Sequence, residues 1–137
     1  MTVLESFQLL IDFGLVVLIW MVQLLIYPSF LFYSREQLIK WHHVYTQRLS
    51  FIVIPLMFSQ LFLTVYLFFI GISMSSSINL VVVLLLWAST FSMFVPIHSN
   101  ISKGNSNPEM LNRLVSINWF RTILWTLLFL YNSRCFF

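Results

Sequence analysis

Long apolar runs, interrupted only at intervals by polar side chains, dominate the pattern along this chain. No charged residue occurs between Phe13 and Ser34 or between Leu49 and Ser102. A helix needs roughly 20 apolar residues to cross about 30 Å of hydrocarbon, so the second run is long enough for two membrane spans. The small and polar residues at 71–79 mark its break. The pattern predicts four spans, at residues 7–29, 48–71, 78–97 and 113–132.

These spans predict an all-α fold, an integral membrane four-helix transmembrane bundle that forms one domain over residues 1–137. The composition agrees, because 60% of the residues are hydrophobic and only 8% are charged, whereas a soluble domain carries about a quarter charged residues. The connections between the spans are too short to hold a soluble domain. The one cysteine, Cys135, excludes a disulfide within the chain.

Local motifs indicate where the helices begin and bend. Residues 2–5 and 34–37 have the spacing of capping boxes, with Thr or Ser first and Glu or Gln last. Asn107 before Pro108 is typical of an N-cap followed by the first helical residue. Pro55 lacks a backbone donor, and it predicts a kink in the second span.

The basic residues predict the orientation of the bundle. Arg35, Lys40, Arg48, Lys103 and Arg113 lie on the side of the first and third connections, whereas Arg134 lies on the opposite side. The positive-inside rule then places both termini outside the cytoplasm and the two basic connections within it. His43, His98 and Arg48 are therefore expected at the cytoplasmic mouth of the bundle.

Arg121 stands out because it lies deep inside the fourth apolar segment. At 1.5 Å per residue from Arg113, it lies about 12 Å below the boundary, close to the membrane midplane. An intramembrane charge there costs about 2.5–3.5 kcal/mol unless another group compensates it. Asn118 and Trp125 share its helical face, so this stripe is expected to face the bundle. The sequence offers Arg121 no carboxylate at its own depth.

Three ways of accommodating Arg121 remain open. Hydrogen bonds to Gln23, Gln60, Tyr27 and the carbonyls freed by prolines would give it a structural role. The anionic or carbonyl head of an apolar ligand, such as a lipid, a quinone or a polyketide-like molecule, would make it a binding residue. A partner chain would supply a carboxylate in the third case. Asp12, nearer the other surface, is expected to pair locally with Arg134, or alternatively to relay protons or cations.

The residues that the sequence marks as candidates for ligand binding are Arg121, Asn118, Gln23, Gln60, Tyr27, His43, His98 and Arg48. Haem stays open as a cofactor, because a histidine of the pair at 42–43 together with His98 could bind it across two helices. The pair itself diverges by about 100° on a helix, so the two rings cannot share one metal ion. No metal ligands are predicted.

Other classes of function have little support in the sequence. No serine or cysteine lies in a recognisable nucleophile motif. The net charge of +3 follows from the membrane topology, and no basic stripe indicates binding to nucleic acid. The expected partners are membrane lipid, a hydrophobic small molecule, and a second copy of the chain or another membrane subunit, because buried amides favour helix association.

Several short motifs suggest a family resemblance. The chain contains Gln23-x-x-x-Tyr27-Pro28, Pro96-x-His98 and Asn118-Trp119-x-Arg121-Thr122. With these motifs it resembles small uncharacterised four-span proteins of bacteria and, distantly, the anthrone-oxygenase-like membrane family. This resemblance implies a bacterial inner membrane protein and cofactor-independent oxidation of a hydrophobic aromatic. The layout is also similar to the four-span haem-associated protoporphyrinogen oxidases, although residues 7–29 contain no histidine.

The sequence therefore predicts a multi-pass membrane protein with a polar site around Arg121 that opens to the cytoplasm. The preferred function is the binding of a hydrophobic ligand or lipid, or a role as accessory subunit of a membrane complex. The alternative is a membrane oxidoreductase or oxygenase that acts on a hydrophobic aromatic or quinone-like substrate in the same site.

Overall fold

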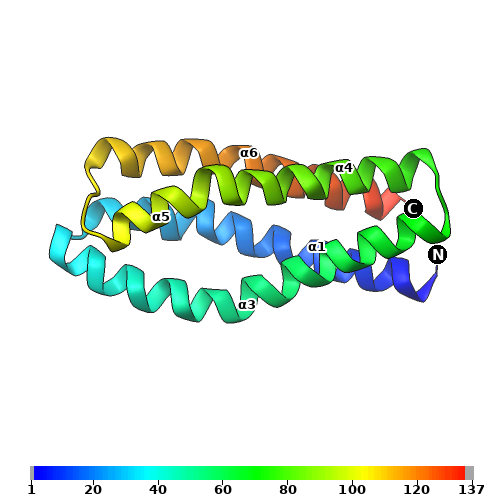
Figure 1. Ribbon diagram of the computed structural model, residues 1–137, viewed down its shortest axis with the longest axis horizontal. Helices are drawn as coiled ribbons and strands as arrows, with labels where there is room; N and C mark the ends of the chain where they lie inside the picture. The colour runs from blue at the N-terminus through cyan, green and yellow to red at the C-terminus, as the bar shows by residue number, and fades with distance from the viewer. Residues whose placement is uncertain (1, 135–137) are drawn as a thin grey trace.

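The computed structural model describes residues 2–134 as four long helical segments that lie side by side (Figure 1). The first segment comprises α1 (Val3–Met21), the π-helix η1 (Val22–Ile26), α2 (Tyr27–Ser29) and the 3₁₀-helix η2 (Phe30–Phe32). The second is α3 (Arg35–Ile70), and the fourth is α6 (Pro108–Ser133). The third comprises α4 (Met74–Ser89), the π-helix η3 (Thr90–Phe94) and α5 (Val95–Ser102). Each segment is long and apolar enough to cross a membrane, which confirms the predicted all-α four-helix bundle of a multi-pass membrane protein.

The two ends of the bundle differ in what they carry (Figure 1). The loop end holds the connections at residues 33–34 and 103–107, and the terminal end holds the start of α1, the end of α6 and the connection at 71–73. Arg35 joins the two connections of the loop end, because its Nη2 donates to the carbonyl oxygen of Ser106 at 3.1 Å. Cys135 lies outside the described residues.

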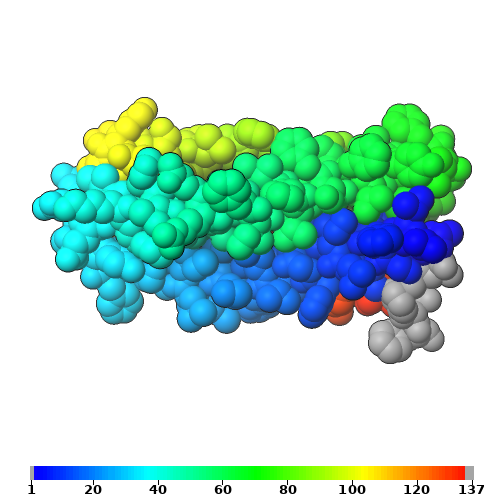
Figure 2. Space-filling model, turned by 90° about the horizontal axis from the view of Figure 1, so that it is seen from below, coloured from blue at the N-terminus to red at the C-terminus, as the bar shows by residue number. Residues whose placement is uncertain are grey.

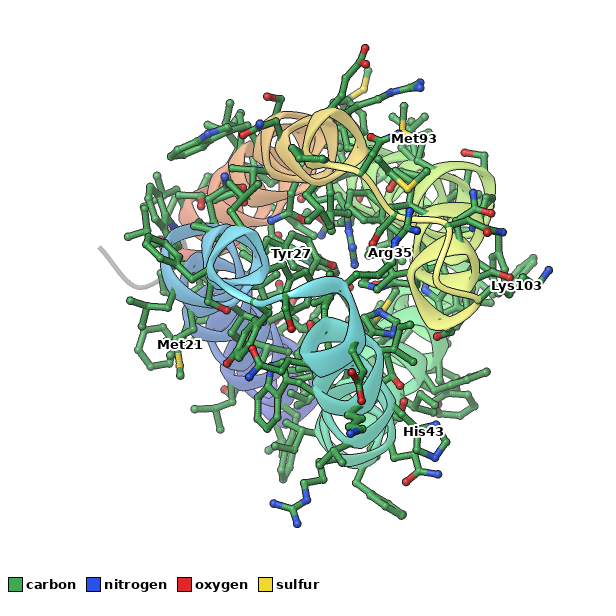
Figure 3. All side chains as sticks on the ribbon, turned by 90° about the vertical axis from the view of Figure 1, so that its left-hand side faces the viewer. Met21, Tyr27, Arg35, His43, Met93 and Lys103 are labelled. Atoms are coloured by element: carbon green, nitrogen blue, oxygen red, sulfur yellow. The ribbon has the colours of Figure 1, made fainter. Side chains whose placement is uncertain are left out.

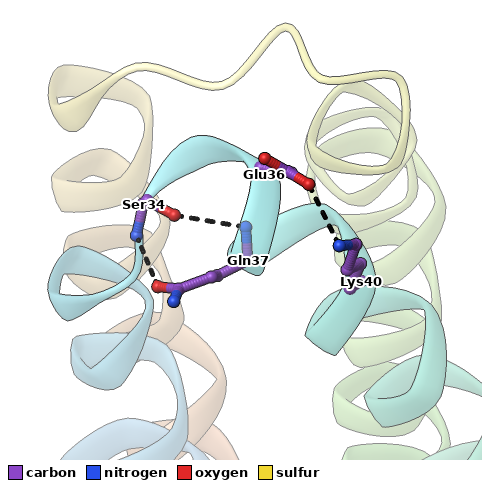
Figure 4. Close-up of polar contacts among 4 residues, drawn as sticks. All are labelled: Ser34, Glu36, Gln37 and Lys40. Carbon is purple, nitrogen blue, oxygen red and sulfur yellow. Dashed lines mark hydrogen bonds and ion pairs between the residues drawn. The ribbon is translucent and has the colours of Figure 1, made fainter.

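The predicted helix starts are confirmed. Thr2 Oγ1 accepts a hydrogen bond from the backbone nitrogen of Glu5 at 3.2 Å, as a capping box requires. In the second box, Ser34 Oγ accepts from the Gln37 nitrogen at 3.3 Å and the Ser34 nitrogen donates to Gln37 Oε1 at 3.4 Å (Figure 4). Asn107 caps α6 through its Oδ1. These caps satisfy backbone donors that the first turn of a helix leaves free.

Prolines act on the helices in two different ways. Pro28 and Pro96 each lie two residues beyond a π-helix, which absorbs the hydrogen bond that proline cannot donate. Pro55 lies inside α3, which continues as one helix and changes direction near its middle (Figure 1). α5 continues the third helical segment to Ser102, beyond residue 97, where the predicted span ends. His98 is therefore held on a helix and does not begin a loop.

Apolar and polar residues are distributed as expected for a protein in a lipid environment. Large apolar side chains such as Phe51, Phe62 and Phe69 are exposed on the outside of α3. Figure 2 shows one such outer face, on which α1 and α3 lie side by side. Polar side chains are concentrated inside, where Asp12 and Gln60 are fully buried. The interior therefore carries the groups from which a functional site can be built.

Candidate functional site

A cavity of about 620 Å³ runs from the loop end to the middle of the bundle. Its walls come from α3 and from the third helical segment, and residues of α1 and α6 complete it. Most of the lining side chains are apolar. The titratable or charged side chains in the lining are those of Tyr27, His42, Tyr45, His98 and Arg121. The volume falls within the range of roughly 300–1,000 Å³ that is usual for small-molecule sites.

Arg121 enters this cavity between aromatic rings. Its side chain is only 7% exposed. The Cζ atom lies 4.2 Å from the ring centroid of Phe94 and 5.0 Å from that of Trp125. A desolvated cation over an aromatic face gains about 2 kcal/mol, so two such contacts offset much of the cost of burying the charge. Tyr27 and Tyr45 line the same cavity as the guanidinium.

Arg121 has no ion-pair partner among residues 2–134. The one salt bridge in this part of the chain joins Lys40 and Glu36 on the surface of α3 (Figure 4). Arg121 Nε is also buried without a hydrogen-bond acceptor. A second donor of the cavity wall, Trp87 Nε1, is likewise buried and unpaired in the described structure.

The carboxylate of Asp12 is connected to Arg121 only through other side chains. Asp12 Oδ1 accepts from Gln60 Nε2 at 2.7 Å, and its Oδ2 accepts from Asn132 Nδ2 at 2.8 Å. Trp125 Nε1, which can only donate, donates to Gln60 Oε1 at 3.2 Å. This bond fixes the orientation of the Gln60 amide, so that its nitrogen faces Asp12. One indole and one amide thus separate the buried cation from the buried anion.

The expected pairing of Asp12 with Arg134 is wrong. The Arg134 guanidinium lies 3.6 Å from the centroid of the Tyr131 ring, and its Nη2 donates to Ser75 Oγ at 3.4 Å. Asp12 is fully buried and uses neutral amides as donors. Gln60 faces Asp12 and Trp125, and it does not contribute to the wall of the cavity.

A continuous chain of hydrogen bonds leads from the cavity to the loop end. Tyr27 Oη lies 3.0 Å from His98 Nε2, and His98 Nδ1 lies 2.7 Å from His42 Nε2. His42 Nδ1 lies 3.0 Å from Ser102 Oγ. The His42 ring is fully buried, whereas Ser102 is exposed at the end of α5. We call these four residues the relay: Tyr27, His98, His42 and Ser102.

The two π-helices explain how the relay residues reach each other. A π-turn contains one extra residue, which rotates everything that follows by about 100°. Tyr27 follows η1 directly, and His98 lies one turn beyond the end of η3. Each π-helix is stabilised locally by its proline, Pro28 or Pro96. π-bulges are frequent at functional sites, and here both of them position side chains of the same cavity.

Gln23 and Asn118 lie together but outside the cavity wall. Asn118 Nδ2 donates to Gln23 Oε1 at 2.9 Å, and Thr122 Oγ1 donates to the same oxygen at 3.1 Å. Gln23 Nε2 donates to the carbonyl oxygen of Val115 at 3.1 Å. This cluster joins η1 to α6, and it holds the turn of α6 that carries Arg121.

The remaining candidate residues lie on the outside of the bundle. His43 and Arg48 are exposed. Figure 3, which views the bundle from the loop end, shows His43 pointing away from it and Tyr27 near its centre. The structure thus brings His42 and Tyr45 into the site, whereas the sequence singled out His43. The inward direction of His42 had a signal in the sequence. Leu38, His42 and Tyr45 recur at helical spacing, so His42 shares a helical face with two buried apolar residues.

The histidines do not fit haem or a metal ion in this arrangement. Both ring nitrogens of His98 and both of His42 are engaged in hydrogen bonds. Neither ring therefore presents a free nitrogen to an iron atom. Among residues 2–134, no group of three or more His, Cys, Asp or Glu side chains is placed to hold a metal ion. The donor set fits hydrogen bonding and proton transfer.

The chain was also compared with known proteins. No family model, no curated protein and no solved structure matches it. The resemblances drawn from the short motifs therefore stay predictions, and the function is inferred from the site alone.

Proposed function

We propose that this membrane protein binds an amphipathic molecule, a lipid or another hydrophobic ligand, whose anionic head group contacts Arg121 and whose apolar tail lies in the cavity. It would act as a binding protein or as an accessory subunit of a membrane complex. The observation that carries this proposal is a buried guanidinium that lines an apolar cavity without a carboxylate partner in the described structure.

The unpaired polar atoms of the cavity support a ligand that brings acceptors. Arg121 Nε and Trp87 Nε1 are both donors, and both are buried without partners in the part of the chain that the structure describes. An unsatisfied buried donor costs about 1–3 kcal/mol. A carboxylate or a related oxyanion at this place would accept from the guanidinium and remove part of that cost.

The tail would leave the cavity sideways, between α3 and the third segment. Ile54 and Phe58 on one side and Phe91 and Val95 on the other line the cavity and are exposed. An apolar gap of this kind faces lipid in a membrane, so a lipid-like molecule can enter without crossing water. The bend of α3 and the π-helix η3 both lie along this gap.

The proposal includes an orientation. The loop end carries Arg35, Lys40 and Lys103, so we place it in the cytoplasm by the positive-inside rule. A bacterial inner membrane is the expected location. Association into a homo-oligomer or with another subunit stays a prediction.

Mass spectrometry of lipids extracted from the purified protein tests the proposed function. We expect a bound amphiphile in the wild type and in the control variant Arg48→Met, whose side chain is exposed. Arg121→Met should lose this molecule, and Arg121→Lys should keep part of it because lysine retains the charge. Binding of a brominated fatty acid, measured by quenching of tryptophan fluorescence, provides a second readout that uses Trp87 and Trp125 in the cavity wall. Equal ligand content and equal quenching in the wild type and Arg121→Met would contradict the proposal.

A further inference from the structure

Each member of the relay is a hydroxyl or an imidazole, and each can both donate and accept a hydrogen bond. Hydroxyl groups do so directly, and a neutral imidazole donates from one nitrogen and accepts at the other. The three contacts of the relay measure 3.0, 2.7 and 3.0 Å, so no step is broken. By contrast, the chain from Arg121 to Asp12 passes through an indole and an amide, which do not exchange protons readily.

The donor inventory gives the relay one consistent direction. Arg121 can only donate hydrogen bonds, and it lines the same cavity as Tyr27. The Tyr27 hydroxyl is then free to donate to His98 Nε2, so that His98 Nδ1–H donates to His42 Nε2. His42 Nδ1–H in turn donates to Ser102 Oγ. The inner end of this chain is at the head-group position, and its outer end is exposed.

We propose that the relay conducts a proton between the ligand head group at Arg121 and the loop end, and that the ligand is therefore a weak acid on an apolar body, a carboxylic acid or a phenol. This inference rests on the proposed function, and it narrows the ligand to an acid that gains and loses one proton. A permanently charged phosphodiester would have no use for such a relay.

The proton transfer balances without any further reactant. The neutral acid gives its proton to the Tyr27 oxygen while Tyr27 passes its own proton to His98 Nε2. His98 then passes the Nδ1 proton to His42, and His42 passes its Nδ1 proton to Ser102, whose own proton leaves to water. The anion remains at Arg121, and each imidazole ends as its other neutral tautomer. The relay is reset when the hydroxyl groups rotate and each imidazole returns to its first neutral tautomer.

Such a path serves a head group that is held in the interior of the bundle. A neutral acid enters from the lipid through the apolar gap, but the charge-stabilising group lies in the interior. The proton cannot leave through hydrocarbon, because an isolated ion there is strongly disfavoured. The relay reaches the surface in three hydrogen bonds, and each of its two neutral imidazoles can accept a proton at one nitrogen while it releases one from the other.

An alkylated nitrophenol tests this inference, because its anion absorbs visible light and its neutral form does not. The purified full-length protein in detergent is first saturated with this compound, and binding is measured by the change in its spectrum. A rapid pH jump then follows the absorbance of the bound compound, which reports how fast its head group exchanges a proton. We expect fast exchange in the wild type, and exchange that slows in D₂O.

The variants separate the relay from binding and from folding. His42→Gln keeps a neutral hydrogen-bonding side chain but cannot pass a proton as imidazole does, so exchange measured at saturating compound should slow at least about tenfold. His98→Gln should do the same. The neighbouring His43→Gln, exposed and turned outward, is the matched control and should exchange at the wild-type rate.

The possible outcomes distinguish the inference from the function on which it rests. Equal exchange rates in the wild type, His42→Gln and His98→Gln would overturn the relay and leave ligand binding intact. A bound compound that stays neutral at all pH values would also overturn it. Failure of the wild type to bind the compound, or equal binding by Arg121→Met, would contradict the proposed function itself.

Discussion

Replacement of Gln60 by leucine should destabilise the bundle by breaking the link between the two buried charges. Leucine has a similar volume but leaves Asp12 Oδ1 without its 2.7 Å donor and Trp125 Nε1 without its 3.2 Å acceptor. In water-soluble proteins, two unsatisfied buried groups would cost about 2–6 kcal/mol. In membranes a hydrogen bond averages about 0.6 kcal/mol and reaches about 1.7, because the unfolded segments also find partners. We therefore expect a loss of about 1–3 kcal/mol in the free energy of unfolding.

The assay is equilibrium unfolding of the detergent-solubilised protein by SDS, followed by circular dichroism and tryptophan fluorescence. Gln47→Leu is the matched control, because Gln47 lies on the same helix and is exposed. The double variant Gln60→Leu with Asp12→Leu removes both partners, and a coupling energy of at least about 0.5 kcal/mol is expected between the two sites. If Gln60→Leu unfolds at the same SDS fraction as Gln47→Leu, the charge link contributes nothing and the reasoning is refuted.

Three further predictions concern other parts of the chain. Trp87→Phe removes an unpaired buried donor, so it should leave the free energy of unfolding unchanged or higher, as measured by SDS titration, and it should lower the amount of amphiphile that copurifies, as measured by mass spectrometry. Gly104→Ala should lower the thermal midpoint, because φ is +76° and the new Cβ would lie 3.0 Å from Ile39 Cδ1; the backbone cost alone is about 1–2 kcal/mol. Glu36→Gln breaks the ion pair with Lys40. Because the Glu36 and Lys40 side chains are 81% and 75% exposed, respectively, the thermal midpoint should stay unchanged.

The inward direction of Arg121 followed from the sequence because it depends on one helix alone. Asn118, Arg121 and Trp125 recur at helical spacing, and a charge on this stripe is stable only away from lipid. The helix starts followed for the same reason, since each capping motif lies within four residues. Such features need no knowledge of the neighbouring segments.

The arrangement around Asp12 and the histidines required the third dimension. Prolines indicate where a helical hydrogen bond is lost. They do not show that a π-turn absorbs the loss before Pro28 and Pro96, whereas α3 continues as one helix through Pro55. The extra residue in each π-turn decides which side chains face inward afterwards. For the same reason, the pairing of Asp12 with Asn132, at opposite ends of the sequence, has no local signal.

The position of Asp12 has a consequence for biogenesis. Membrane segments leave the ribosome in chain order, so α1 would enter the lipid before α3 supplies Gln60 and long before α6 supplies Asn132. Until then, the Asp12 carboxylate would have no amide donors in the membrane. Chains truncated before α6 should therefore be held by the insertion machinery or degraded, while the complete chain assembles as its last segment arrives.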